Sequence, residues 1–186
     1  MRAAILVVLV VTLLVGGYIW QNKDSKAPTQ EEETQNQIYE NTDYGVSLTY
    51  PDSYVLEERE LGTGERWHHN ITIMDREAAA NILQNGEGPP SITIDIVQND
   101  LDGLSVSDWI NNDSRSNFKL LLDGTHTSAI VAGKEATRYA WDGLYRGESV
   151  VFEHKGNIIM ASVSSFEPTD KIYADFGGIL SSFQLK

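Results

Sequence analysis

The sequence contains no cysteine among its 186 residues. This absence excludes disulfide bonds, a cysteine nucleophile and the attachment of a lipid to a lipobox cysteine. The folded part must therefore depend on its hydrophobic core alone. Such a composition fits an extracytoplasmic bacterial domain and a cytosolic protein equally well.

The sequence also lacks a specific catalytic motif. It has no Gly-x-Ser-x-Gly nucleophile elbow, and the stretch from Gly62 to Glu65 lacks the remaining glycine and the following helix pattern of a phosphate-binding loop. The adjacent carboxylates of Glu57 and Glu58 lie in a polar stretch, where nothing suggests the burial that raises a catalytic pKa. We therefore expect a protein that is not an enzyme, with no catalytic residues and no required cofactor.

Basic residues are scarce relative to acidic ones. The chain has 14 Lys and Arg against 27 Asp and Glu, a net charge of −13, and from Ile38 onward the two counts are 11 and 23. A surface of this sign repels nucleic-acid phosphates and anionic lipid headgroups. We expect no nucleic-acid partner, and we favour cations or basic proteins instead.

One apolar run stands out, from Ala3 to Trp20, where eighteen residues carry no charge. A helix of this length rises roughly 27 Å at ~1.5 Å per residue, which just spans a hydrocarbon core of about 30 Å. Arg2 before the run favours a cytoplasmic N-terminus. The run predicts a transmembrane signal anchor over residues 1–20, which would place a single-pass protein in the cell membrane with its C-terminal domain outside the cytoplasm.

Two other interpretations of this run remain open. Val15, Gly16 and Gly17 could form a small-residue cleavage site for a signal peptidase, which would release a secreted protein near Gly17. The run could also be a buried core element, although its length and position argue against that. Residues 21–37 contain no large apolar side chain and predict a disordered polar tether, so the folded domain is expected over residues 38–186.

Hydrophobic alternation with a period of two predicts most of this domain to be strands. The clearest strand covers residues 91–98, where Ile92, Ile94 and Ile96 face one way and Thr93 and Asp95 face the other. Further strands are expected over residues 44–50, 54–58, 68–74, 125–131, 135–141, 148–154 and 157–164.

Three helices are expected between and after these strands. Asp75 can cap a helix over 76–84, and Ser107 can cap one that runs to about 117. The last helix starts near Asp170, and a close approach to the sheet would offset the cost of its Gly177 and Gly178. Short turns join the last four strands and imply antiparallel neighbours. The fold class is therefore α+β, an antiparallel sheet flanked by helices.

Four segments resemble motifs of the PsbP-like domain family, the relatives of the extrinsic oxygen-evolving-complex subunit of photosystem II. The resemblance implies an α-β-α sandwich and a role in binding or assembly. The apolar run and tether stand where the photosynthetic subunits carry a transit peptide, which favours a bacterial membrane-anchored envelope protein. The segments are an aromatic-Gly-Phe-Ser-x-x-Tyr-Pro strand at Tyr44–Pro51, a Ser-Leu-x-x-Trp helix start at Ser105–Trp109, a Gly-x-x-Ala strand start at Gly133–Ala136 and an Ile-x-x-Ser-Phe helix at Ile179–Phe183.

Two groups of residues are weak candidates for a divalent cation such as calcium. His68 and His69 are adjacent in a predicted strand, so they point to opposite faces and cannot share one metal without a bulge. Asp100 and Asp102 fit positions of a calcium loop, but the loop lacks its first carboxylate and its bidentate glutamate. Ordinary hydrogen bonding of the histidines and an acidic turn are the favoured interpretations.

Aromatic side chains supply the remaining candidates for ligand or partner binding. We select Trp67, Trp141, Tyr145 and Arg146, of which the last three belong to an expected loop from Trp141 to Gly147. A place in the core is the alternative for both tryptophans. The function expected from the sequence is a membrane-tethered, extracytoplasmic, non-enzymatic binding or assembly domain of the envelope. The alternatives are a metal-dependent envelope hydrolase that uses the histidines, and a secreted ligand-binding protein.

Overall fold

The computed structural model describes residues 35–63, 66–82, 87–99, 103–122 and 124–186. All of them belong to one compact unit, Thr34–Lys186. The expected anchor and residues 21–34 of the expected tether lie outside the described residues. Within the described ranges, no helix combines the length and the apolar character needed to cross a bilayer.

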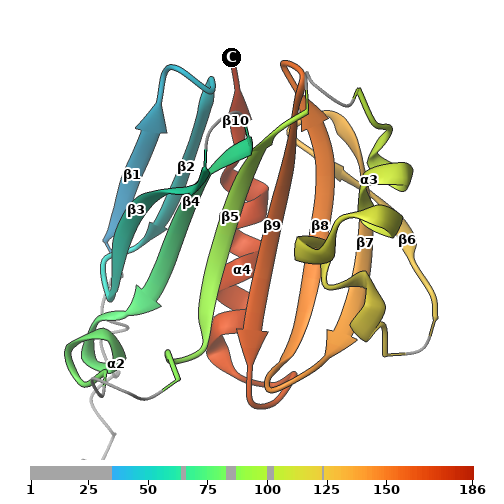
Figure 1. Cartoon of the computed structure of the whole chain (residues 1–186). Helices are drawn as coiled ribbons and strands as arrows, with labels where there is room; N and C mark the ends of the chain where they lie inside the picture. Colours follow the sequence, from blue (N-terminus) through green and yellow to red (C-terminus); the bar gives the residue numbers. More distant parts are fainter. Residues whose placement is uncertain (1–34, 64–65, 83–86, 100–102, 123) are drawn as a thin grey trace, which may run out of the picture. The chain divides into compact units, whose positions relative to one another are not determined.

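The largest part of the described fold is one seven-stranded antiparallel sheet (Figure 1). This confirms the expected sheet with a few helices. Strands that are joined by short turns lie side by side, as the sequence predicted. In spatial order the strands are β3 (Tyr54–Thr63), β4 (Arg66–Asp75), β5 (Ser91–Gln98), β9 (Asn157–Ser165), β8 (Arg146–His154), β7 (Lys134–Asp142) and β6 (Thr127–Val131).

A second, three-stranded sheet was not expected. It has the order β1-β2-β10 and consists of β1 (Asn36–Asn41), β2 (Val46–Pro51) and β10 (Gln184–Leu185). The strand β1 corrects the expected tether boundary, because residues 36 and 37 pair with β2. Backbone pairing along β2 needs few apolar side chains, and only Tyr39 of β1 is buried, so hydrophobic alternation did not reveal this strand.

The main core lies between the large sheet, the small sheet and helix α4 (Lys171–Ser182). Burial of the isoleucines on alternate positions of β4 and β5 is complete. They pack against the apolar stripe of α4, and Ser182 of this helix accepts a hydrogen bond from the Thr49 backbone N–H at 2.9 Å. The isoleucines are Ile71, Ile73, Ile92, Ile94 and Ile96.

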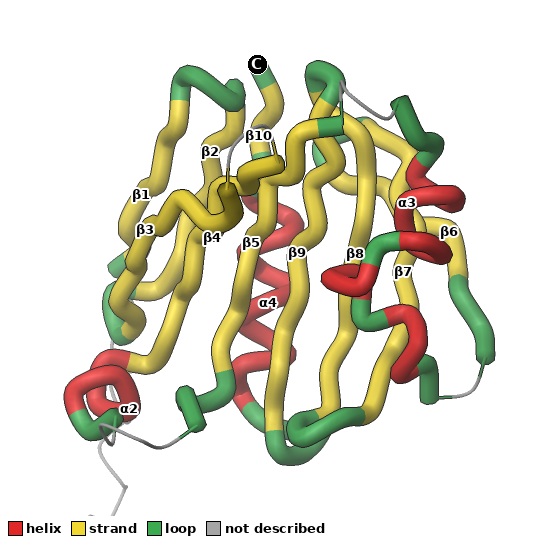
Figure 2. Tube along the Cα trace, in the orientation of Figure 1, coloured by secondary structure: helices red, strands yellow, loops and turns green. Residues whose placement is uncertain are grey.

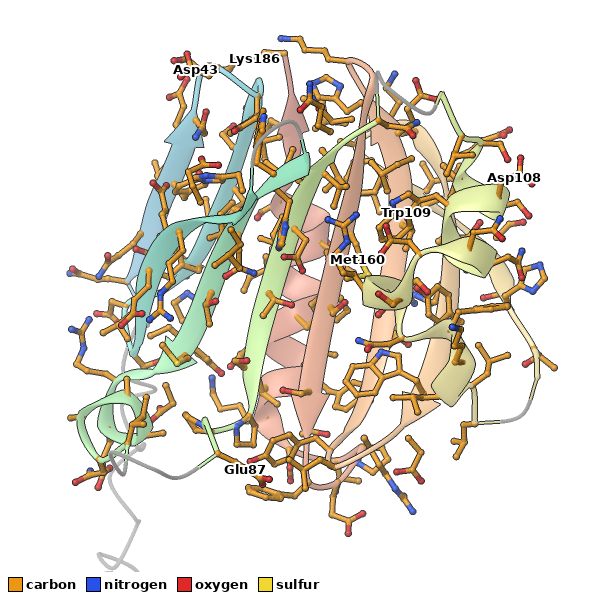
Figure 3. The ribbon with its side chains drawn as sticks, viewed as in Figure 1. Asp43, Glu87, Asp108, Trp109, Met160 and Lys186 are labelled. Carbon is orange, nitrogen blue, oxygen red and sulfur yellow. The ribbon has the colours of Figure 1, made fainter. Side chains whose placement is uncertain are left out.

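The opposite face of the large sheet is covered only in part. Helix α3 (Val106–Asn112) and the 3-10 turns η1 (Ser114–Ser116) and η2 (Phe118–Leu120) lie over β7 and β8, whereas β4 and β5 carry no helix on this face (Figures 1 and 2). Trp109 of α3 is buried against the sheet in one cluster with Met160 (Figure 3). This short cover leaves the β4–β5 part of the face without a helix.

Several element ends differ from the sequence prediction for local reasons. The cap of α3 is Ser105, because its hydroxyl accepts the Asp108 N–H at 3.1 Å, and Ser107 lies inside the helix. That helix ends at Asn112, since Asp113 caps η1 instead. Helix α2 (Arg76–Ala80) is one short turn after the expected cap Asp75. Strand β3 continues to Thr63 because its polar residues pair with β4.

Glycine substitutions should separate a packed position from two open ones. A Cβ on Gly147 would overlap the Trp141 indole ring. Nothing lies within 4 Å of a Cβ on Gly177 or Gly178, which corrects the expected close approach of α4 at these glycines. Gly147→Ala should lower the free energy of unfolding by about 1–3 kcal/mol. Gly177→Ala should raise it by up to about 1 kcal/mol. Urea denaturation of the two variants measures both; equal effects would contradict the packing.

Candidate functional site

The β4–β5 part of the large sheet carries a half-buried cluster of polar side chains around Asp95. Alternation along β5 turns the isoleucines into the core and turns Thr93 and Asp95 to the open face. Only 14% of the Asp95 side-chain surface is exposed to solvent. Its Oδ1 accepts a hydrogen bond from Asn70 Nδ2 at 2.8 Å and lies 3.5 Å from His68 Nε2.

The environment of Asp95 opposes its charge. Burial raises the pKa of Asp95 above its usual value, and the hydrogen bond from Asn70 and the charges of His68 and Arg115 only partly counteract this. A carboxylate held in such a position costs stability, which is a mark of functional sites in general. Asp95 is therefore the strongest single candidate for a functional residue among the described ones.

Arg115 joins this cluster from the turn η1. Its Nη1 lies 3.4 Å from His68 Nδ1. The guanidinium is oriented by Asp113, whose Oδ1 accepts from Arg115 Nε at 2.8 Å. Burial would raise the pKa of Asp113, but the hydrogen bonds and charge of Arg115 prevail and hold it below its usual value. The cationic group beside His68 is thus fixed in place by a partner carboxylate.

A row of hydroxyl groups runs across the strands next to Asp95. The register places Thr72 opposite Thr93, Thr93 opposite Ser162 and Ser162 opposite Ser149. Side chains directly opposite on neighbouring strands share a face. The two serines are buried and bonded to each other at 2.8 Å, and Trp141 Nε1 donates to Ser149 Oγ at 2.9 Å. Thr72 and Thr93 are the partly exposed members of the row.

We call the partly exposed members of this cluster the Asp95 face and define them as His68, Asn70, Thr72, Thr93 and Asp95. It offers a carboxylate, an amide, an imidazole and two hydroxyls on a rigid sheet, an arrangement that suits hydrogen bonding to a partner surface. Within the described parts of the chain, no three or more His, Asp and Glu side chains are grouped in a way that could hold a metal ion.

The two adjacent histidines point to opposite faces of β4, as predicted. His69 lies in the core, where its Nδ1 is 2.6 Å from Glu60 Oε1 and its Nε2 is 3.4 Å from the Tyr39 hydroxyl. The Tyr44 ring packs on it with centroids 5.0 Å apart. His69 is thus a core histidine with both ring nitrogens engaged, and only His68 belongs to the Asp95 face.

The aromatic candidates are not brought together. Trp67 is half-buried, with its ring 6.0 Å from that of Tyr44. Trp141 is 9% exposed and lies inside β7, so the expected loop from Trp141 to Gly147 shrinks to residues 143–145 between two strands. Tyr145 and Arg146 lie at that turn, where the Tyr145 hydroxyl donates to the Gly88 carbonyl at 2.8 Å. Their proposed role in binding stays a prediction.

The remaining cation candidates lie elsewhere. Asp100 and Asp102 fall outside the described residues. His154 is buried at the end of β8, where burial and then the charges of Lys155 and Lys134 lower its pKa, while the Gly45 and Lys186 carbonyls oppose this. An open hollow of about 790 Å³ lies between the start of α3 and the β6–β7 edge. Its lysines and glutamates are all exposed, so it lacks the half-buried charge that marks Asp95.

Sequence reasoning did not select Asp95, Arg115 or the hydroxyl row. The available signal was the polar side of residues 91–98, where an acidic residue alternates with isoleucines. The approach of Arg115 depends on the turns after α3, which no sequence pattern indicated.

Solved structures resemble this fold, and cyanobacterial PsbP is among them. The chain superimposes on the solution structure of cyanobacterial PsbP (CyanoP) from Synechocystis sp. PCC 6803 with a TM-score of 0.55 and 13% identity. The match covers 86% of this chain and 98% of that one. It supports the PsbP-like fold expected from the sequence motifs. No protein-family model and no curated protein matches the chain.

Replacing Asp95 should stabilise the protein near neutral pH. A raised carboxyl pKa in the folded state means that stability is lost as pH rises through that value, so the destabilisation is absent at acidic pH and present once the carboxyl is ionised. Asp95→Asn removes the charge and keeps an oxygen for Asn70. We expect a higher melting temperature than wild type at pH 7 and a smaller difference at pH 3.5. The exposed Glu135→Gln serves as control; a lower melting temperature for Asp95→Asn at pH 7 would contradict the assignment.

We expect His154 to lower the stability of the folded protein as pH falls. Its pKa is lowered in the folded state, so the unfolded chain binds the proton first as pH drops below about 6.5. Stability is therefore present above that pH and decreases below it. In thermal melts between pH 7.5 and 5, His154→Gln should flatten this decrease, whereas the exposed His126→Gln should leave it unchanged. Parallel curves for wild type and His154→Gln would refute this prediction.

Proposed function

We propose that this chain is a membrane-tethered, extracytoplasmic binding or assembly domain of a bacterial cell envelope, and that it acts without catalysis. The apolar run from Ala3 to Trp20 supports the tether, and the polar stretch that follows supports a domain held beside the membrane. The partner is a protein or another envelope component.

The observation that carries the binding role is the position of Asp95, a largely buried carboxylate on a part of the sheet face that no helix covers. An apolar residue there would relieve the cost of its buried charge. The hydroxyl and amide groups around it have fixed positions because β4 and β5 are paired on both sides. A partner that supplies hydrogen-bond donors would satisfy the carboxylate and displace water from the face.

The charge of the domain favours the same class of partner. Because acidic residues exceed basic ones about two to one from Ile38 onward, a basic protein surface is attracted and an acidic one repelled. The Asp95 carboxylate gives such a partner a specific contact, whereas the general negative charge acts on the rate of encounter.

Photo-crosslinking in intact cells tests this proposal. Thr93 or Thr72 of the full chain is replaced by a photo-crosslinking phenylalanine analogue, and Thr127 on edge strand β6 carries the same analogue as control. We expect one adduct from the first two positions, no such adduct from the control, and a several-fold lower yield when Asp95→Asn is added. Equal labelling at all positions, or none, would overturn the binding face.

The topology is read from the same cells. Protease added outside intact cells or spheroplasts should digest the domain. If the domain stays protected, it lies in the cytoplasm, and the proposed extracytoplasmic role is wrong.

A further inference from the structure

One end of the large sheet is where the chain joins the domain. The Gln35 carbonyl accepts a hydrogen bond from the Asp52 N–H at 2.9 Å, and Asn36 pairs with Pro51. Pairing from strand to strand shows that the strand ends here are the start of β3, the end of β4, the start of β5, the end of β9, the start of β8 and the end of β7. We call this the Gln35 end; Glu87 lies there, and Asp43 and Lys186 lie at the opposite end (Figure 3).

Exposed apolar side chains gather at the Gln35 end. The β7–β8 turn presents Leu144, which is 68% exposed, and the loop after β9 presents Phe166, which is 65% exposed. Leu120 and Leu122 are exposed beside the end of β7, where the Leu122 N–H donates to the Ala140 carbonyl. These are four of the eight large exposed hydrophobic residues in the described part of the chain, so their concentration at one end is not a general property of the surface.

Local contacts hold Phe166 and Leu120 in place. The Phe166 ring packs edge-on against that of Tyr145, with centroids 5.3 Å apart, and the Tyr145 hydroxyl is tied to Gly88. Leu120 packs against the turn at Gly143, where an added Cβ would lie 3.2 Å from Leu120 Cδ1. The cluster of Leu120, Leu144, Tyr145 and Phe166, which we call the end cluster, thus offers one aromatic and aliphatic tip.

The length of the preceding chain indicates what covers the end cluster. Residues 21–34 separate the apolar run from Gln35, and a tether of this length, if disordered as expected from the sequence, would span roughly 20 Å. The chain reaches the domain at the same end that carries the cluster. Arg146 forms ion pairs there: its Nε lies 3.9 Å from Asp142 Oδ2, and its Nη1 lies 3.8 Å from Glu167 Oε2. The cluster is therefore not surrounded by excess positive charge and suits a zwitterionic surface.

We propose that the end cluster is a second membrane contact, in which Leu144 and Phe166 enter the headgroup layer of the bilayer that holds the chain. This inference rests on the proposed function, because it needs the tether. It orients the domain with the Gln35 end against the membrane and the strands standing away from it. The Asp95 face then points sideways along the membrane surface, toward partners in the same membrane.

Site-specific fluorescence on the full chain tests this contact. The native sequence has no cysteine, so Leu144→Cys, Phe166→Cys and Ile130→Cys each give one labelling site for an NBD fluorophore. Ile130 is a matched control, since it is 68% exposed like Leu144 but pairs near the start of β7, away from the Gln35 end. Each protein is reconstituted in phosphatidylcholine vesicles with or without lipids that carry a nitroxide near the headgroup.

We expect the label at positions 144 and 166 to shift to the blue and to lose at least half of its emission to the nitroxide lipid, with little change at position 130. A chain that floats with the vesicles but shows equal quenching at all positions overturns the second contact and leaves the tether intact. A blue shift that grows with protein concentration and ignores the nitroxide assigns the end cluster to a second copy and also overturns it. A chain that does not float with the vesicles contradicts the tether and therefore the proposed function.

Discussion

The rest of the structure depends on the burial of one layer of isoleucines. Ile71, Ile73, Ile92, Ile94 and Ile96 are sealed between the large sheet and α4. Because side chains alternate along a strand, this burial also decides what the same two strands present on their other side. A slip of one residue would move Asp95 into the core and the isoleucines into water, so the core that stabilises the domain also fixes the polar face.

The Asp95 face has no helix over it because the elements that cover this side of the large sheet are short. Helix α3 and its two 3-10 turns bury Trp109 and Tyr139 over β7 and β8 but do not reach across β4. Where the cover ends, Arg115 extends from its last turns to His68. The edge of a hydrophobic layer therefore supplies the cation that borders the Asp95 face. This placement combines a rigid sheet with a partly dry environment, in which hydrogen bonds are stronger than in bulk water.

The strands with buried alternate positions were predictable from the sequence, and β5 was found with its observed limits because its isoleucine period is unambiguous. The strands β1 and β10, and the outer half of β3, were not predictable, because edge pairing through the backbone leaves no hydrophobic period. The capping residue of α3 was misplaced by two positions, since Ser105 and Ser107 both suit a cap and only the contact with the Asp108 N–H decides between them. The candidate site combines residues from β4, β5 and η1, so its assembly required the strand register.

The pairing of β2 with β10 has a consequence for the order in which this chain can fold during its synthesis. Val46 lies opposite Leu185, and the Lys186 N–H donates to the Gly45 carbonyl. The small sheet joins the first and last strands of the domain, so it cannot close until residue 185 has left the ribosome. If the chain crosses a membrane as it is made, the large sheet can assemble outside in advance, and the small sheet then closes last over an already formed isoleucine layer. Until the final strand arrives, the edge of β2 that pairs with β10 stays without its strand partner.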